Sequence, residues 1–241
     1  MKLARRTARA HVTQALLLRR VDLGEADLVL HFLTETTGRI AAVARAARKS
    51  QKRFGGALEP FHTLRVQLEE RHGSELMTLG EAAIATARSR VVSNLDRMQA
   101  AGRVLAWVRR ATPPHVREAA IWSSIVSFLD VLESGGTDLC IDTEVAKTGL
   151  QLLTACGWGL ELEQCVVCAK RCDSDRTAFV DAARGGLVCR ACGGTGTRLG
   201  GAQRARFRAA TSGAAQSLRQ ADTALALSVV EAALRAHLGF E

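Results

Sequence analysis

The sequence predicts an α+β protein with a small N-terminal β-barrel, a helical domain and a cysteine-rich ribbon inserted among the helices. Short apolar runs separated by turn residues fill roughly the first 80 positions, and helical periodicity follows from about residue 81. Two Cys-x-x-Cys pairs then interrupt the helical pattern. We therefore expect a barrel domain at 1–80, a helical domain at 81–241 and a metal-binding insertion at 161–195. Residues 1–10 are a candidate basic arm.

The barrel prediction rests on five short strands, expected at residues 12–20, 26–34, 39–45, 58–68 and 76–79. Turn chemistry separates the first three, and Gly38 suits a turn position with positive φ. Five strands in about 70 residues favour a closed or nearly closed barrel. The basic segment 46–56 between the third and fourth strands is expected to be a mobile loop.

The helical part is expected to contain four helices whose apolar rows form a core. The first carries Ile84, Arg88 and Val91 on one face and continues to Val108. Thr112 and Pro113 resemble an N-cap followed by proline at the first helical position, so a second helix is expected there. It stops at Gly135-Gly136, a third starts near residue 142, and a last one runs from residue 222 to 239.

The two cysteine pairs predict a structural metal site. Twenty residues separate Cys165-Val166-Val167-Cys168 from Cys189-Arg190-Ala191-Cys192, and a hairpin over 179–188 fits between them. This spacing is typical of a zinc ribbon with one Zn²⁺ held by four thiolates. Four protein ligands leave no position for water, so the ion is expected to be structural. The predicted ligands are Cys165, Cys168, Cys189 and Cys192.

The other cysteines have less specific surroundings. Cys172 is either a bystander or an exchangeable or redox-active ligand, and the sequence leaves both open. Cys140 and Cys156 are expected to be small core residues.

The net charge of +9 is concentrated at one end of the chain. Residues 1–56 hold twelve basic and four acidic residues, a local charge of +8. So local an excess favours a polyanionic partner, most plausibly nucleic acid. The alternative is a basic surface without a ligand.

No catalytic centre is identified in the sequence. The nucleotide-binding, zinc-protease and serine-hydrolase motifs are missing, and the six histidines pair with no nucleophile. We therefore expect a protein that is not an enzyme and has no small-molecule substrate. No apolar run reaches about 18 residues, and the first 20 residues do not form a signal peptide. We expect a cytoplasmic protein without a membrane partner.

Two segments resemble the bacterial RecO family of recombination mediators. The first includes Gly24-Glu25-Ala26-Asp27-Leu28-Val29-Leu30, Gly38-Arg39-Ile40 and Gly56-Ala57-Leu58-Glu59-Pro60-Phe61. The second has Gly157-Trp158 before the first cysteine pair and Gly185-Gly186 before the second. The resemblance is most specific at 24–61 and 157–192 and extends over nearly the whole chain.

The resemblance implies an N-terminal OB-fold barrel, a helical domain and a zinc motif within that domain. It implies binding to single- and double-stranded DNA, annealing of complementary strands and association with RecR. It also implies contact with the C-terminal tail of single-stranded DNA-binding protein, and help in loading RecA onto coated strands. A protein with these partners is expected in the nucleoid.

Ten basic residues are the predicted DNA contacts: Arg5, Arg6, Arg9, Arg19, Arg39, Arg45, Arg48, Lys49, Lys52 and Arg53. Arg45 and Arg48 match the family's basic strand-end motif. Phe54 is the candidate for stacking on bases, because Phe32 and Phe61 lie in apolar strands. With so few aromatic residues, binding is expected to be mainly electrostatic.

A pocket for the acidic tail of single-stranded DNA-binding protein needs a basic rim and an apolar floor. The candidates are Arg103, Trp107, Arg109 and Arg110, which share one predicted helix. The alternative is a solvated basic face beside a core tryptophan. Two other functions remain open for the whole protein: a zinc-ribbon regulator or RNA-binding module, and a thiol-redox or zinc enzyme.

Overall fold

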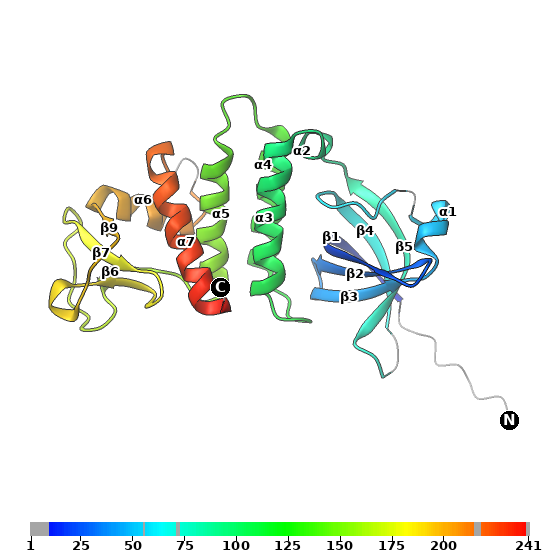
Figure 1. The fold of residues 1–241 in the computed structure, drawn as a ribbon, viewed down its shortest axis with the longest axis horizontal. Helices are drawn as coiled ribbons and strands as arrows, with labels where there is room; N and C mark the ends of the chain where they lie inside the picture. The colour runs from blue at the N-terminus through cyan, green and yellow to red at the C-terminus, as the bar shows by residue number, and fades with distance from the viewer. Residues whose placement is uncertain (1–9, 55, 71–72, 215–217, 240–241) are drawn as a thin grey trace. The chain divides into compact units, whose positions relative to one another are not determined.

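The structure is a computed structural model of the 241-residue chain, and it describes residues 10–54, 56–70, 73–214 and 218–239 (Figure 1). The side chains of residues 51 and 52 are outside this description. The chain forms two compact units that divide between Trp122 and Ser123. In the described part of the chain, no helix is long and apolar enough to cross a membrane.

The first unit contains the predicted five-stranded closed barrel. Its strands are β1 Ala10–Leu23, β2 Asp27–Thr34, β3 Gly38–Ala44, β4 Thr63–Glu69 and β5 Leu76–Thr86. The strand order is β1-β2-β3-β5-β4, and the barrel closes through antiparallel pairing of β1 with β4. Only the β3–β5 pair is parallel. The OB-like barrel followed by helices confirms the predicted fold class.

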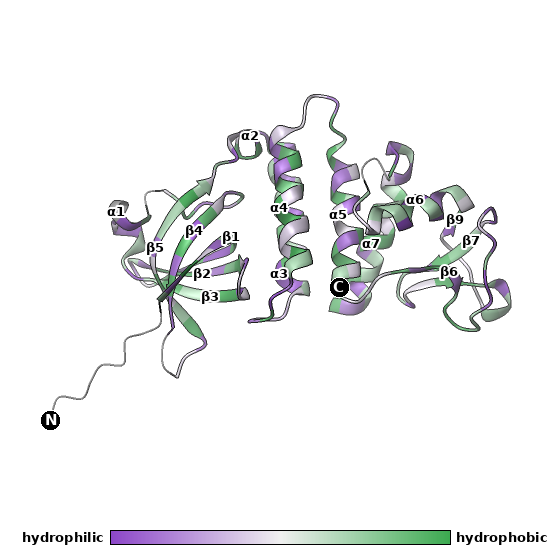
Figure 2. Ribbon diagram, turned by 180° about the vertical axis from the view of Figure 1, so that it is seen from behind, coloured by the Kyte–Doolittle hydropathy of each residue, from purple (hydrophilic) through white to green (hydrophobic). Residues whose placement is uncertain are grey.

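The barrel core follows from the alternation of side chains along each strand. On β2, Leu28, Leu30 and Phe32 are at most 3% exposed and belong to one apolar cluster with Ile40 and Leu64. Because successive strand residues point to opposite faces, the residues between them face outward. The burial along β2 follows this alternation from Asp27 to Phe32, and Figure 2 shows hydrophobic residues in the strands of the barrel. The outward positions are therefore free to carry the barrel's charge.

Three local predictions about this region are wrong. The strand β5 continues to Thr86, so the change to helix comes later than residue 81 and Ile84 lies on a strand. The expected loop 46–56 instead contains the short helices η1 Ala47–Lys49 and α1 Gln51–Phe54. Leu58 and Phe61 are buried but precede β4. The extension of β5 follows from its pairing with β4, in which Leu64 is opposite Ile84 and Thr63 is opposite Thr86.

After β5 the chain forms α2 Ser89–Val92 and α3 Leu95–Ala111. The Asn94 side chain caps α3 by accepting a hydrogen bond from the Arg97 amide at 3.0 Å. Thr112 is the C-cap of α3, which contradicts its predicted role as an N-cap. Pro113 disfavours the helical conformation at Thr112, and the Thr112 hydroxyl donates to the Val108 carbonyl at 2.7 Å.

One glycine has a steric requirement at the barrel surface. Gly38 has φ 74°, and a Cβ there would lie 1.9 Å from the carbonyl oxygen of Val116. The glycine predicted from turn chemistry therefore also permits the 112–117 segment to approach the β2–β3 hairpin.

The helix α4 Ala119–Ser134 begins before the division and continues into the second unit. That unit also contains α5 Ile141–Ala155, α6 Gly201–Thr211 and α7 Thr223–Leu238, with α5 in contact with α6 and α7. The last helix ends at Gly239 in the left-handed region, as predicted. Asp222, the expected cap, precedes it, but its side chain makes no capping hydrogen bond and instead accepts from Arg206. The helix α6 was not among the predicted helices, because its row of alanines and arginines has little apolar periodicity.

The predicted ribbon is present in the second unit as a four-stranded sheet. Its strands are β6 Glu161–Cys165, β7 Ala178–Asp181, β8 Gly186–Val188 and β9 Arg198–Leu199, in the order β6-β8-β7-β9. The hairpin expected over 179–188 is the antiparallel β7–β8 pair. The strands are short, so the sheet has few apolar residues with which to stabilise itself.

Candidate nucleic-acid interface and metal centre

The most exposed predicted DNA contacts lie where β3 ends. Arg45, Arg48 and Lys49 are exposed on the segment that leads from β3 into η1. The Asp27 carboxylate accepts a hydrogen bond from the Ala46 amide at 2.8 Å, and Ala46 has a left-handed φ of 52°. Asp27 thus shapes the turn that presents these basic residues, a role the sequence did not resolve.

Arg53 is partly buried, and its guanidinium is bonded within the barrel domain. Its Nη2 donates to the Arg45 carbonyl at 2.5 Å and its Nε donates to the Ser50 hydroxyl at 3.2 Å. Its guanidinium also lies 4.9 Å from the centre of the Phe54 ring. Phe54 is only 3% exposed and belongs to the barrel core, so its predicted role in stacking on bases is wrong.

Arg53 lines a surface groove of about 560 Å³ along the outer sides of β4 and β5. Arg65 and Glu81 contribute opposite charges to it, and Val12, which is 51% exposed, contributes apolar surface. The sequence analysis missed Arg65. Its position between the inward-facing Leu64 and Val66 is the signal that could have identified it as an outward charge.

The other predicted DNA contacts occupy separate places. Arg19 is exposed on β1, whereas Arg39 is partly buried and its Nε donates to the Thr112 carbonyl at 2.8 Å. The next residue on β1, Arg20, pairs with Glu59 at 3.3 Å. Four predicted contacts, Arg5, Arg6, Arg9 and the Lys52 side chain, lie outside the described residues.

The residues of the predicted tail pocket lie on α3, and its tryptophan is buried. Trp107 is only 8% exposed, and the Arg103 guanidinium lies 5.2 Å from the centre of its ring. Arg109 is partly buried and Arg110 is exposed in the last turn of α3. The buried ring corresponds to the alternative of a basic face beside a core tryptophan.

The structure brings the four predicted metal ligands together in the second unit. The Sγ atoms of Cys165, Cys168, Cys189 and Cys192 all lie within 4.8 Å of one another. Those of Cys168 and Cys189 are 3.8 Å apart. A tetrahedron with Zn–S bonds of about 2.3 Å has sulfur–sulfur edges of about 3.8 Å. The four thiols therefore fit one tetrahedral metal ion.

Backbone hydrogen bonds hold the cysteine pairs in tight turns. The Ala169 amide donates to the Cys165 carbonyl at 2.8 Å, and the Gly194 amide donates to the Cys189 carbonyl at 3.0 Å. The Cys189 amide donates to Cys165 Sγ at 3.4 Å. A Cβ at Gly194 would lie 2.0 Å from the Val188 carbonyl oxygen, so the glycine there is required by close approach.

The thiols influence one another's protonation strongly. Hydrogen bonds from the backbone at Cys189 and Cys168 lower the pKa of Cys165 to about 6, although burial opposes this shift. Hydrogen bonds with the Cys189 and Cys168 side chains raise the pKa of Cys192 to about 12. The first proton therefore leaves easily and the last one with difficulty. A bound cation would offset the accumulating negative charge, and its binding would release protons.

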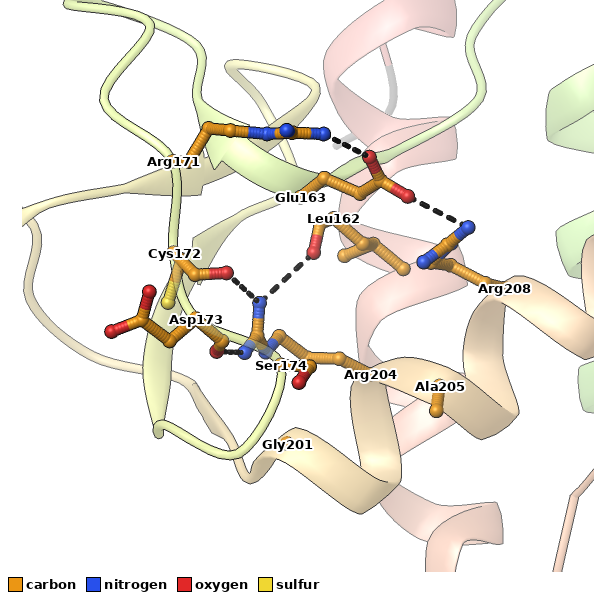
Figure 3. A pocket seen from close by; sticks show the side chains of 10 residues that line it. All are labelled: Leu162, Glu163, Arg171, Cys172, Asp173, Ser174, Gly201, Arg204, Ala205 and Arg208. Carbon is orange, nitrogen blue, oxygen red and sulfur yellow. Dashed lines mark hydrogen bonds and ion pairs between the residues drawn. The ribbon is translucent and has the colours of Figure 1, made fainter.

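A buried arginine connects the ribbon loop to α6. Arg204 is 4% exposed, and its guanidinium donates to the carbonyls of Leu162, Cys172 and Asp173 (Figure 3). It also donates to the Arg176 carbonyl at 2.9 Å. It lines a pocket of about 350 Å³, at whose edge the Glu163 carboxylate pairs with Arg208 at 2.7 Å and Arg171 at 3.6 Å. Cys172 lines this pocket and is not a member of the metal cluster.

Comparisons with known proteins agree with this architecture. Residues 9–88 match the model "Recombination protein O N terminal", and residues 92–241 match "Recombination protein O C terminal". The chain is 33% identical over 184 residues to DNA repair protein RecO of Anaeromyxobacter dehalogenans strain 2CP-1, covering 76% of this chain and 70% of that protein. It is 32% identical over 186 residues to the Geobacter sulfurreducens protein of the same name, covering 77% and 74%.

Proposed function

Because the chain belongs to the RecO family of DNA repair proteins, we propose that it is a recombination mediator that binds single- and double-stranded DNA and anneals complementary strands. The observation that carries this proposal is the exposed basic segment at the end of β3. Within the described residues, Arg45, Arg48 and Lys49 form no ion pair, so their charges are available to phosphates.

Phosphate contacts without base stacking suit strand annealing. The barrel phenylalanines Phe32, Phe54 and Phe61 are at most 8% exposed, so they offer no stacking surface for bases. Arginine and lysine can neutralise the backbone while the base edges remain free to pair. Two strands bound in this way would repel each other less and could form a duplex.

In this proposal the C-terminal unit supplies the scaffold and the contacts with partners. Zinc held by the four cysteines would crosslink the ends of the ribbon and supply no catalytic position. We also propose, from membership of the family, that the protein associates with RecR and with the tail of single-stranded DNA-binding protein. Through them it would help RecA to load onto coated strands in the nucleoid.

The test compares single charge reversals that leave the barrel core untouched. Arg45→Glu, Arg48→Glu and Lys49→Glu should each weaken single-stranded DNA binding and slow annealing of complementary oligonucleotides. Arg235→Glu makes the same change of charge at an exposed position of α7 and is the matched control. Unchanged annealing in the three folded barrel variants would contradict the proposal.

A competition experiment separates this function from that of a zinc-ribbon regulator or RNA-binding module. Unlabelled single-stranded DNA of mixed sequence and RNA of the same sequence should displace a labelled DNA strand equally well. Strong preference for RNA, or for one defined sequence, would favour the alternative function.

A further inference from the structure

A second group of basic side chains gathers on the outer face of β1, β2 and β3. Arg19 on β1 is directly opposite His31 on β2, and His31 is opposite Ala41 on β3. Arg39 lies two residues from Ala41 and therefore on the same face as His31. This face points away from the barrel core, because the intervening residues Phe32 and Ile40 are buried inside it.

The end of α3 adds a third arginine to this face. Arg39 Nε donates to the Thr112 carbonyl at 2.8 Å, which fixes the C-terminal end of α3 beside β3. Arg109 lies in the last turn of α3, three residues before Thr112. We call the group of Arg19, His31, Arg39 and Arg109 the His31 cluster.

The His31 cluster has an excess of positive charge. Within the described residues, no acidic side chain forms an ion pair with any of its members. Burial, together with the charges of Arg19, Arg39 and Arg109, lowers the pKa of His31 below its usual value. The three arginines thus lie near enough to His31 to act on it.

We propose that the His31 cluster is a second phosphate-binding site for the nucleic acid, which extends the DNA path from the barrel onto the end of α3 and binds more tightly when His31 is protonated. The inference rests on the proposed DNA-binding function. It also assigns Arg109, which the sequence placed in a pocket for a protein tail, to the nucleic acid.

The sign of the pH effect follows from the charges that face His31. In the free protein, partial burial and the charges of Arg19 of β1, Arg39 of β3 and Arg109 of α3 lower the pKa of His31 and disfavour the imidazolium. A bound phosphate brings negative charge among these groups and stabilises the imidazolium. Binding therefore takes up a proton, and affinity should rise as the pH falls through the titration range of His31.

The experiment measures binding of a fluorescent oligothymidylate at about pH 8 and about pH 6, on either side of the usual histidine pKa. Wild-type affinity should rise at the lower pH by up to about tenfold for each unit by which phosphate raises the pKa of His31. His31→Gln should abolish most of this rise. His237→Gln, which alters a histidine of α7, should retain it.

The salt dependence of binding tests the arginine independently. Arg109→Gln should make the log–log salt slope on single strands shallower by about 0.7, the value for one lost phosphate contact, and Arg109→Lys should restore it. If Arg109 merely stabilises the helix end, Arg109→Gln will lower the melting temperature and leave the slope unchanged, which overturns the inference.

The outcomes distinguish this inference from the proposed function. If His31→Gln retains the full rise in affinity at the lower pH, the inference is also overturned, whatever the effect of Arg48→Glu on binding. If Arg48→Glu weakens binding while both His31 cluster variants behave as wild type, DNA binding stands and only the second site is wrong. If wild-type protein does not bind the oligonucleotide, the proposed function itself fails.

Discussion

The barrel and the cysteine ribbon are stabilised by different kinds of interaction. The barrel has a continuous apolar core contributed by all five strands, and Arg45, Arg48 and Lys49 are exposed on its surface. The ribbon has strands of two to five residues, and it relies on four thiols and on buried polar side chains such as Arg204. A large core leaves charged residues available for ligands, whereas a small core uses its polar residues for folding.

Loss of a metal ligand should cause the largest loss of stability, and this loss should fall on the ribbon. Structural zinc contributes roughly 10–16 kcal/mol of apparent binding free energy in small domains. Cys165→Ser should therefore abolish stoichiometric zinc binding and unfold the ribbon. Cys156→Ser changes a cysteine outside the cluster and should retain the metal. Metal analysis and thermal melting test both variants.

The same cysteine variant also separates the two regions functionally. DNA affinity per folded barrel should remain close to that of wild type, because the basic residues belong to the other unit. A folded, metal-free Cys165→Ser protein that had lost only DNA binding would contradict the structural assignment of the metal.

A cavity in the barrel core should destabilise the barrel and leave the ribbon with its metal. Phe32 is fully buried in the barrel core, so Phe32→Ala should cost roughly 3–5 kcal/mol of folding free energy. DNA binding should decrease while the zinc content remains stoichiometric. Loss of zinc from this variant would show that the stability of the ribbon depends on the barrel.

Acid should weaken the C-terminal unit through Asp222. Hydrogen bonds from Arg206 lower the pKa of this carboxyl, whose side chain is 1% exposed and lies 2.6 Å from Arg206 Nε. A lowered pKa stabilises the fold above the ordinary aspartate value of about 3.9, and this stability is lost as the pH falls through the lowered pKa. Asp222→Asn should cost about 1–3 kcal/mol at neutral pH.

The role of Asp222 is tested by measuring how the melting temperature depends on pH in the wild type and in Asp222→Asn. Wild-type protein should lose more stability on acidification below about pH 4 than Asp222→Asn does, because the variant has no carboxylate to protonate. Equal losses in the two proteins would contradict this role of Asp222.

The smallest change in the free energy of unfolding is expected at the exposed ion pair of the barrel. Arg20 and Glu59 are 48% and 60% exposed, so Glu59→Gln should change the free energy of unfolding by less than about 1 kcal/mol. Denaturant titration measures this change. A larger loss would show that surface charges do contribute to barrel folding.

Much of the fold and the metal site could be predicted from local sequence patterns. Alternation gave the five strands, and the spacing of Cys165, Cys168, Cys189 and Cys192 predicted the cluster because each pair closes a short turn. The sequence did not predict α6, which lacks an apolar stripe and has the buried Arg204 bonded to the ribbon loop. Such a tertiary contact leaves no signal in the local pattern.

The candidate DNA site was less predictable than the metal site. Charge density located it on the barrel, but local sequence could not distinguish the buried Phe54 from an exposed ring. Arg39 and Arg109 are separated by 69 intervening residues in the chain, and the bond from Arg39 to Thr112 brings β3 and the end of α3 together. Only the three-dimensional structure reveals such a grouping.

The salt dependence of duplex DNA binding tests the central claim most directly. If the barrel contacts about five phosphates, the log–log slope of the affinity against salt concentration should be about −4.5, since each contact contributes about −0.9. Combined reversal of Arg45, Arg48 and Lys49 to Glu should make the slope much shallower. A slope near zero for wild type, or an unchanged slope in the folded triple variant, would contradict the account.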